Sequence, residues 1–160
     1  MKKLLIATTA LAAFSVSAPA FAQSSDTTTI SATIPLVCTI DAPDGGAVAV
    51  SGTTEIGSVS AKCNDPDGFT ATLTSLNGGK LTGLDSDNTS TIPYTFTISG
   101  ATDGTGPQSL AAPKVFPRTP GDQTAIDGFS LPMQIQTTGT NGPAFADKYS
   151  DTITFAIVAN

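Results

Sequence analysis

The stretch TTTISATIPLVCTI, from Thr27 to Ile40, introduces the pattern on which this chain is built. From Ile30 onward every second residue is apolar or a cysteine, and serine or threonine fills most of the alternate places. Successive side chains of a β-strand point to opposite faces, so this spacing predicts a long half-buried strand, or two strands in series.

Five further runs repeat the period of two. They are Val59, Ala61 and Cys63; Phe69, Ala71 and Leu73; Ile92, Tyr94, Phe96 and Ile98; Phe129, Leu131, Met133 and Ile135; and Ile153, Phe155 and Ile157. Clusters of glycine, aspartate, asparagine and proline separate the runs and predict turns. The expected fold is therefore all-β, an immunoglobulin-like antiparallel β-sandwich, with a small barrel as the alternative. The prolines between Gln108 and Ile126 favour an irregular excursion or an edge strand there.

The first 22 residues have the features of a secretory signal peptide. Lys2 and Lys3 precede a mostly apolar stretch, and Ala20-Phe21-Ala22 offers small residues for cleavage after Ala22. Residues 23–160 then form a single β-sandwich domain, which passes through the periplasm to the cell surface or the medium. No second apolar run is long enough to span a bilayer, so no membrane span is expected after cleavage.

The chain has two cysteines and no histidine. In an exported protein, Cys38 and Cys63 are expected to form one disulfide. Without histidine, a serine or cysteine nucleophile lacks its usual base, and a zinc or copper site lacks its usual ligands. We therefore expect no enzyme activity, no catalytic residue, no metal and no cofactor.

The formal net charge of -6 argues against a nucleic-acid partner, which requires a basic surface. Two acidic clusters, Asp65/Asp67 and Asp85/Asp87, offer oxygen ligands of the kind that calcium binds. Aspartate also favours tight turns, and this second interpretation is the one we prefer. Calcium binding at either cluster stays open.

Most of the aromatic residues fall in phase with aliphatic residues of the predicted strands and are expected in the core. Phe116 and Phe145 lie in loop-like sequence and are the better candidates for surface contacts. A monomeric secreted module for binding or adhesion is therefore one possible function.

Four segments together resemble a known family. They are Thr27 to Cys38, Ile56 to Cys63, Gly68 to Leu73, and the ending Tyr149-Ser150-Asp151-Thr152-Ile153-Thr154-Phe155. In this pattern the chain is similar to the spore coat protein U domain family, which includes the pilin subunits of archaic chaperone-usher systems. The most specific part is the C-terminal strand motif, formed by Tyr149, Asp151, Thr152, Ile153 and Phe155.

The resemblance implies a secreted structural subunit of a surface fibre or coat. Such subunits are incomplete immunoglobulin-like sandwiches, each completed by a strand donated from the next subunit. The implied partners are identical or related subunits, a periplasmic chaperone and an outer-membrane usher.

The segment 23–34 is the candidate donor strand. Ile30, Ala32 and Ile34 lie on one face of it, as a strand laid into a groove requires. Pro35 lacks an amide hydrogen and separates this segment from the strand near Cys38. The same segment is alternatively the first strand of its own domain, which is what the monomeric module predicts.

Overall fold

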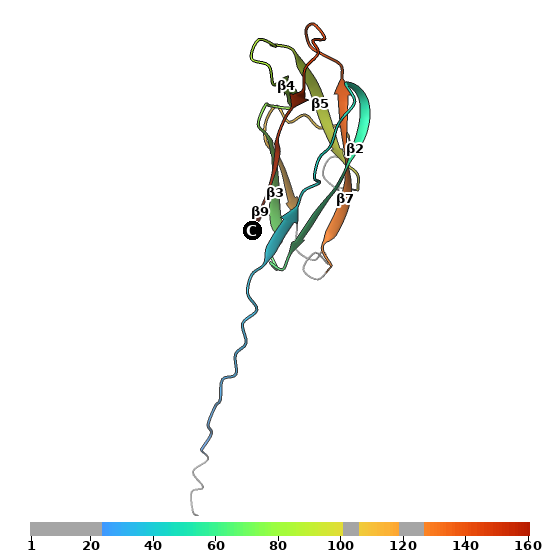
Figure 1. Cartoon of the computed structure of the whole chain (residues 1–160). Helices are drawn as coiled ribbons and strands as arrows, with labels where there is room; N and C mark the ends of the chain where they lie inside the picture. Colours follow the sequence, from blue (N-terminus) through green and yellow to red (C-terminus); the bar gives the residue numbers. More distant parts are fainter. Residues whose placement is uncertain (1–23, 101–105, 119–126) are drawn as a thin grey trace, which may run out of the picture. The chain divides into compact units, whose positions relative to one another are not determined.

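The computed structural model describes residues 24–100, 106–118 and 127–160 (Figure 1). These residues contain nine β-strands and no helix. The strands are β1 (Cys38–Asp41), β2 (Ser51–Cys63), β3 (Phe69–Ser75), β4 (Lys80–Gly83), β5 (Thr91–Ile98), β6 (Lys114–Arg118), β7 (Phe129–Thr138), β8 (Tyr149–Ser150) and β9 (Ile153–Ala159). Within this described part, no helix is long and apolar enough to cross a membrane. The expected signal peptide lies outside the described residues.

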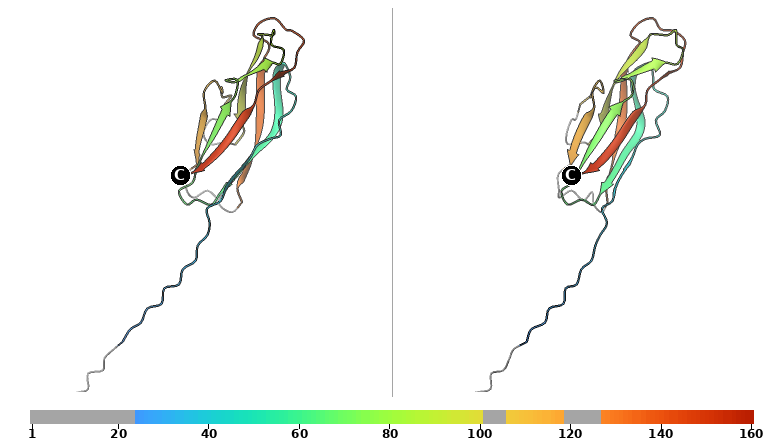
Figure 2. Two further views of the ribbon diagram at one scale, coloured as in Figure 1. Left: turned by 60° about the vertical axis from the view of Figure 1, so that its left-hand side comes forward. Right: turned by 90° about the vertical axis from the view of Figure 1, so that its left-hand side faces the viewer.

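Residues 34–160 fold into two antiparallel sheets. One sheet has six strands in the order β1-β2-β7-β5-β4-β8, and the other has three in the order β6-β3-β9. Figure 2 shows the three strands β6, β3 and β9 side by side. This arrangement confirms the expected all-β sandwich, and the prediction of an edge strand between Gln108 and Ile126 is confirmed by β6.

A β-bulge divides the long strand β2 into two halves. Its pairing with β7 shifts between Glu55 and Gly57, which leaves Ile56 as the extra residue. Inward-facing residues therefore have odd numbers after the bulge, as at Val59, but an even number at Ile56. Gly57 has a φ of +115°, and a Cβ there would lie 2.9 Å from Cβ of Pro43, so glycine is required at this position.

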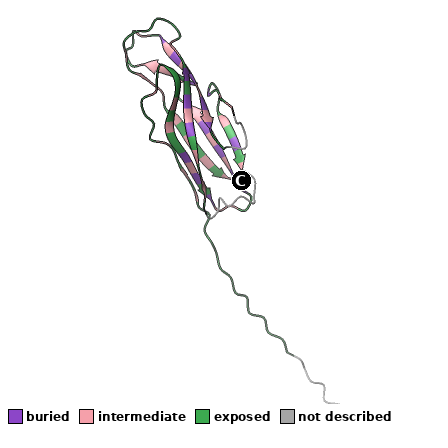
Figure 3. Ribbon diagram, turned by 90° about the vertical axis from the view of Figure 1, so that its right-hand side faces the viewer, coloured by how far each residue is buried: buried purple, intermediate pink, exposed green. Residues whose placement is uncertain are grey.

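The core lies between the two sheets, and buried residues alternate with more exposed ones along the strands (Figure 3). Phe69, Phe96, Leu73, Leu110 and Met133 are its largest fully buried side chains. Phe116 is also buried and meets Phe96 edge to face at 6.3 Å. The expectation of a surface role for Phe116 is therefore wrong, because β6 turns this side chain inward.

The disulfide between Cys38 and Cys63 is confirmed. The two residues lie directly opposite each other in the pairing of β1 with β2. The bond thus fixes the register of a strand only four residues long.

The predicted strand from Thr27 to Ile40 is mostly wrong. Only Cys38–Asp41 is a strand, and residues 24–37 are exposed and lie outside any strand. Alternating apolar residues define a face, but a strand also requires a neighbour for its backbone hydrogen bonds.

Candidate functional site

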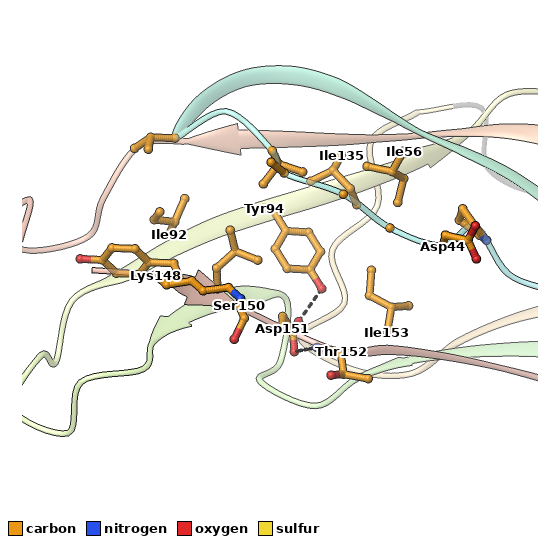
Figure 4. Close-up of a pocket in the computed structure, with 18 of the residues that line it drawn as sticks. Asp44, Ile56, Ile92, Tyr94, Ile135, Lys148, Ser150, Asp151, Thr152 and Ile153 are labelled. Carbon is orange, nitrogen blue, oxygen red and sulfur yellow. Dashed lines mark hydrogen bonds between the residues drawn. The ribbon is translucent and has the colours of Figure 1, made fainter. Parts of the chain in front are cut away.

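A groove of about 740 Å³ opens between the two sheets beside β9. Its walls come from the segment Pro43–Val50, from β8 and β9, and from inward-facing residues of the larger sheet (Figure 4). Besides β8, the larger sheet contributes Ile56, Leu81, Ile92, Tyr94 and Ile135 to the lining. The groove is thus a gap along the seam where the two sheets meet.

Both rims of the groove carry backbone without a strand partner. In the part of the chain that the structure describes, β9 pairs with β3 alone, which leaves its other edge free. On the facing rim, no backbone hydrogen bond joins any of the residues 42–48 to β2 or β9 in this same part. An unpaired strand edge is a template on which a further strand can add.

The lining mixes apolar side chains with polar ones, and several of the apolar side chains are only partly buried although they pack against the core. They are Val48, Ile56, Leu81, Ile153 and Phe155. Covering the half-exposed apolar side chains of this groove with an apolar ligand would be favourable, because it removes apolar surface from water.

Tyr94 provides the main polar feature of the groove. Its hydroxyl donates a hydrogen bond of 2.6 Å to Oδ2 of Asp151 (Figure 4). Asp151 also accepts hydrogen bonds from the Ser75 hydroxyl and from the backbone N–H groups of Asn77 and Thr152. Burial, followed by the bond to Asp151, raises the pKa of Tyr94 above its ordinary value, so the phenol keeps its proton.

A second polar network holds the β8 end of the groove. Nδ2 of Asn88 donates to Oδ2 of Asp147 at 2.9 Å and to the Tyr149 hydroxyl at 3.0 Å. The backbone N–H of Asp85 donates to the same carboxylate at 3.1 Å. These donors, with Asn88 the strongest, lower the pKa of Asp147, so its charge is part of the fixed structure of this loop.

The side chains of Asp65 and Asp85 are engaged in turns. Each carboxylate accepts the backbone N–H two residues later, at 2.8 Å from Asp67 and 3.0 Å from Asp87. No group of three metal-ligating side chains gathers anywhere in the described residues.

All five residues of the C-terminal strand motif line this groove: Tyr149, Asp151, Thr152, Ile153 and Phe155. The three candidate donor residues are exposed, with exposed fractions of 92% at Ile30 and 85% at Ile34. In the rim Pro43–Val50 the sequence predicted only a turn, at Asp44-Gly45-Gly46, and not a wall of a groove.

No protein-family model matches the chain, and no curated protein sequence matches it. The groove and its surroundings therefore carry the functional argument.

Proposed function

We propose that this protein is a secreted structural subunit of a surface fibre or coat, and that subunits assemble by strand donation. In this scheme the segment 23–34 of one subunit fills the groove beside β9 of another. The role is structural and not catalytic. The two unpaired rims of the groove are the observation that carries the proposal, because an inserted strand would give both of them a hydrogen-bonding partner.

The chemistry of the segment suits the groove. Ile30, Ala32 and Ile34 would face the half-exposed apolar lining, while Ser31 and Thr33 would face solvent. Ile30 to Ile34 covers about 13 Å at the rise of a strand, and the free edge of β9 from Ile153 to Ala159 covers about 20 Å. The segment thus has enough length to cover most of that edge.

Export belongs to the same proposal. The signal-like start of the sequence would deliver the chain to the periplasm, where the disulfide between Cys38 and Cys63 forms. A chaperone is proposed to protect the open groove there, and an outer-membrane usher to pass subunits to the surface.

The size distribution of the mature protein tests this proposal. Wild-type protein should form oligomers whose size grows with concentration, and deletion of residues 23–34 should abolish them. Ile30→Asp should do the same because it places a charge in an apolar groove, with a penalty of several kcal/mol. Ser31→Asp is the matched control, and oligomers of this variant should persist because its side chain faces away.

A different result would support a monomeric binding module. In that case the wild-type protein stays monomeric at every concentration, and deletion of residues 23–34 unfolds it. That combination would overturn the fibre proposal, because it would show that the segment completes its own domain.

A further inference from the structure

Asn64 forms hydrogen bonds with the backbone that leads from the candidate donor segment into β1. The Val37 N–H donates to Oδ1 of Asn64 at 2.7 Å, and the Asn64 N–H donates to the Val37 carbonyl at 3.1 Å. Nδ2 of Asn64 also donates to the Pro35 carbonyl at 2.8 Å. Three hydrogen bonds therefore hold Pro35 and Val37 beside the residue that follows the disulfide.

The directions of the strands decide what a self-closing segment would require. The N–H of Asn160 donates to the carbonyl of Gly68, just after the turn that follows Asn64. β9 thus ends at the same end of the sandwich where β1 begins, and the two strands run in opposite directions. A segment folding into its own groove would have to reverse direction between Ile34 and Val37.

The sequence Ile34-Pro35-Leu36-Val37 is suited to such a reversal. Proline favours the second position of a β-turn, and the turn is closed when the fourth residue donates its N–H to the carbonyl of the first. The closing donor here is the N–H of Val37. Asn64 already accepts a hydrogen bond from that N–H, so the hydrogen-bonded form of the turn competes directly with the Asn64 contact.

We infer that Asn64 prevents the donor segment from closing on its own groove and thereby commits it to a second copy of this chain. The inference rests on the proposed function, since it concerns whether the segment fills the groove of its own subunit or that of another. Asn64 acts as a positioning residue: it withholds the N–H that closes the turn and fixes the Pro35 carbonyl. A segment from a second copy needs no reversal and is free to run antiparallel to β9.

Asn64→Ala tests this role in the full mature chain. The variant loses both side-chain hydrogen bonds, and the ratio of closed monomer to oligomer should rise. The rise should lie between about fivefold and about thirtyfold, the effects of one and of two net hydrogen bonds. Light scattering after refolding at low concentration measures the ratio. Asn141→Ala is the matched control, because this exposed asparagine lies outside both the contact and the groove lining.

Hydrogen exchange of the Ile30–Ile34 amides separates closure from mere loss of stability. In wild-type oligomers these amides should be protected, and in wild-type monomers they should exchange freely. In Asn64→Ala monomers they should become protected. If Asn64→Ala misfolds, a second variant inserts Gly-Ser-Gly-Ser after Ile34. The added residues let the chain reverse direction without breaking the Asn64 contact, so the Ile30–Ile34 amides of its monomers should be protected.

The outcomes distinguish a failure of the Asn64 role from a failure of the proposed strand donation. In one outcome the Ile30–Ile34 amides are protected in oligomers, while the monomers of both altered chains stay unprotected and no more abundant than in the wild type. That outcome would overturn the role of Asn64 and leave the proposed function intact. Wild-type oligomers with unprotected Ile30–Ile34 amides would overturn the proposed function itself.

Discussion

The two seams of the sandwich are built differently. Along the seam beside β6 the chain closes its own core: Phe96 and Gln108 exchange two backbone hydrogen bonds, Leu110 is 1% exposed, and Phe116 packs edge to face on Phe96. Along the seam beside β9, β1 approaches the edge strand without a hydrogen-bonded ladder in the described residues, and nearby apolar residues stay half-exposed.

The difference shows that the open seam is local and does not reflect a weak core. Both seams border one continuous core, which includes buried residues of β3, β5 and β7, and no buried side-chain polar atom in the described residues lacks a partner. Residues 106–118 complete one side, and among the described residues no strand pairs with the outer edge of β9 on the other. The proposed strand donation would fill this side with a strand from another subunit.

The sharpest test compares two phenylalanines, one at each seam. Phe96→Ala should lower the free energy of unfolding by about 4 kcal/mol, because it empties a closed site. Phe155→Ala should lower it by only about 1 kcal/mol in the isolated subunit, since its ring is already half-exposed. Urea unfolding of both variants measures the difference. Equal losses would mean that the seam beside β9 is as closed as the other.

The disulfide can be used to widen the open seam. Replacing Cys38 and Cys63 by alanine should lower the free energy of unfolding by about 3.5 kcal/mol, the loop-entropy estimate for a separation of 25 residues. Amides of β1 should exchange faster than those of β5, since four residues of β1 would then be held by the ladder alone. Uniformly faster exchange across both strands would contradict the local character of the opening.

Tyr94→Phe examines the floor of the open groove. The variant loses one donor to a carboxylate that keeps three others, and should be less stable by about 1–2 kcal/mol at neutral pH. The pH dependence provides the second reading. The raised pKa of Tyr94 means that both states hold the proton below pH about 10, whereas above it the unfolded state releases the proton first.

Wild-type stability should therefore fall as the pH rises above about 10, and Tyr94→Phe should fall less steeply. Thermal unfolding between pH 8 and pH 11 makes the comparison, with Tyr149→Phe as the control for the other tyrosine. Identical slopes in wild type and Tyr94→Phe would show that the hydroxyl is not shielded by the groove.

The smallest effect is expected at the acidic turns, which belong to neither seam. Because Asp65 and Asp85 already accept backbone hydrogen bonds, calcium or a chelator should change the free energy of unfolding by less than about 0.5 kcal/mol. Thermal melts with excess calcium and with chelator check this. Unfolding on chelation would mean that these turns hold a structural metal.

Much of the fold could be predicted from the period of two, because five runs of alternating residues became the strands β2, β3, β5, β7 and β9. The first half of β2 escaped prediction because the bulge at Ile56 reverses the phase. β4 and β8 are too short to show a period. Phe116 was misjudged because Pro113 and Pro117 made its surroundings look like a loop, which hid the short strand around it.

The groove was only half predictable. The motif from Tyr149 to Phe155 marked one wall. The facing wall, Pro43–Val50, is irregular backbone that lies against Gly57 at Pro43 and accepts a hydrogen bond from Thr137 at Ala49. Such contacts depend on tertiary structure and leave no local pattern. The alternation of Ile30, Ala32 and Ile34 predicted a face to be covered without indicating whose surface covers it.

The position of the disulfide also has a mechanical consequence for a fibre of the proposed kind. Tension along such a fibre would enter each subunit through the segment before Pro35 and reach Cys38, at the start of β1. A four-residue hydrogen-bonded ladder pulled from its end would rupture readily, but the bond to Cys63 passes the force covalently to β2. Thirteen residues of β2, paired along most of their length with β7, then share the strain, so the subunit would resist being pulled open where the load arrives.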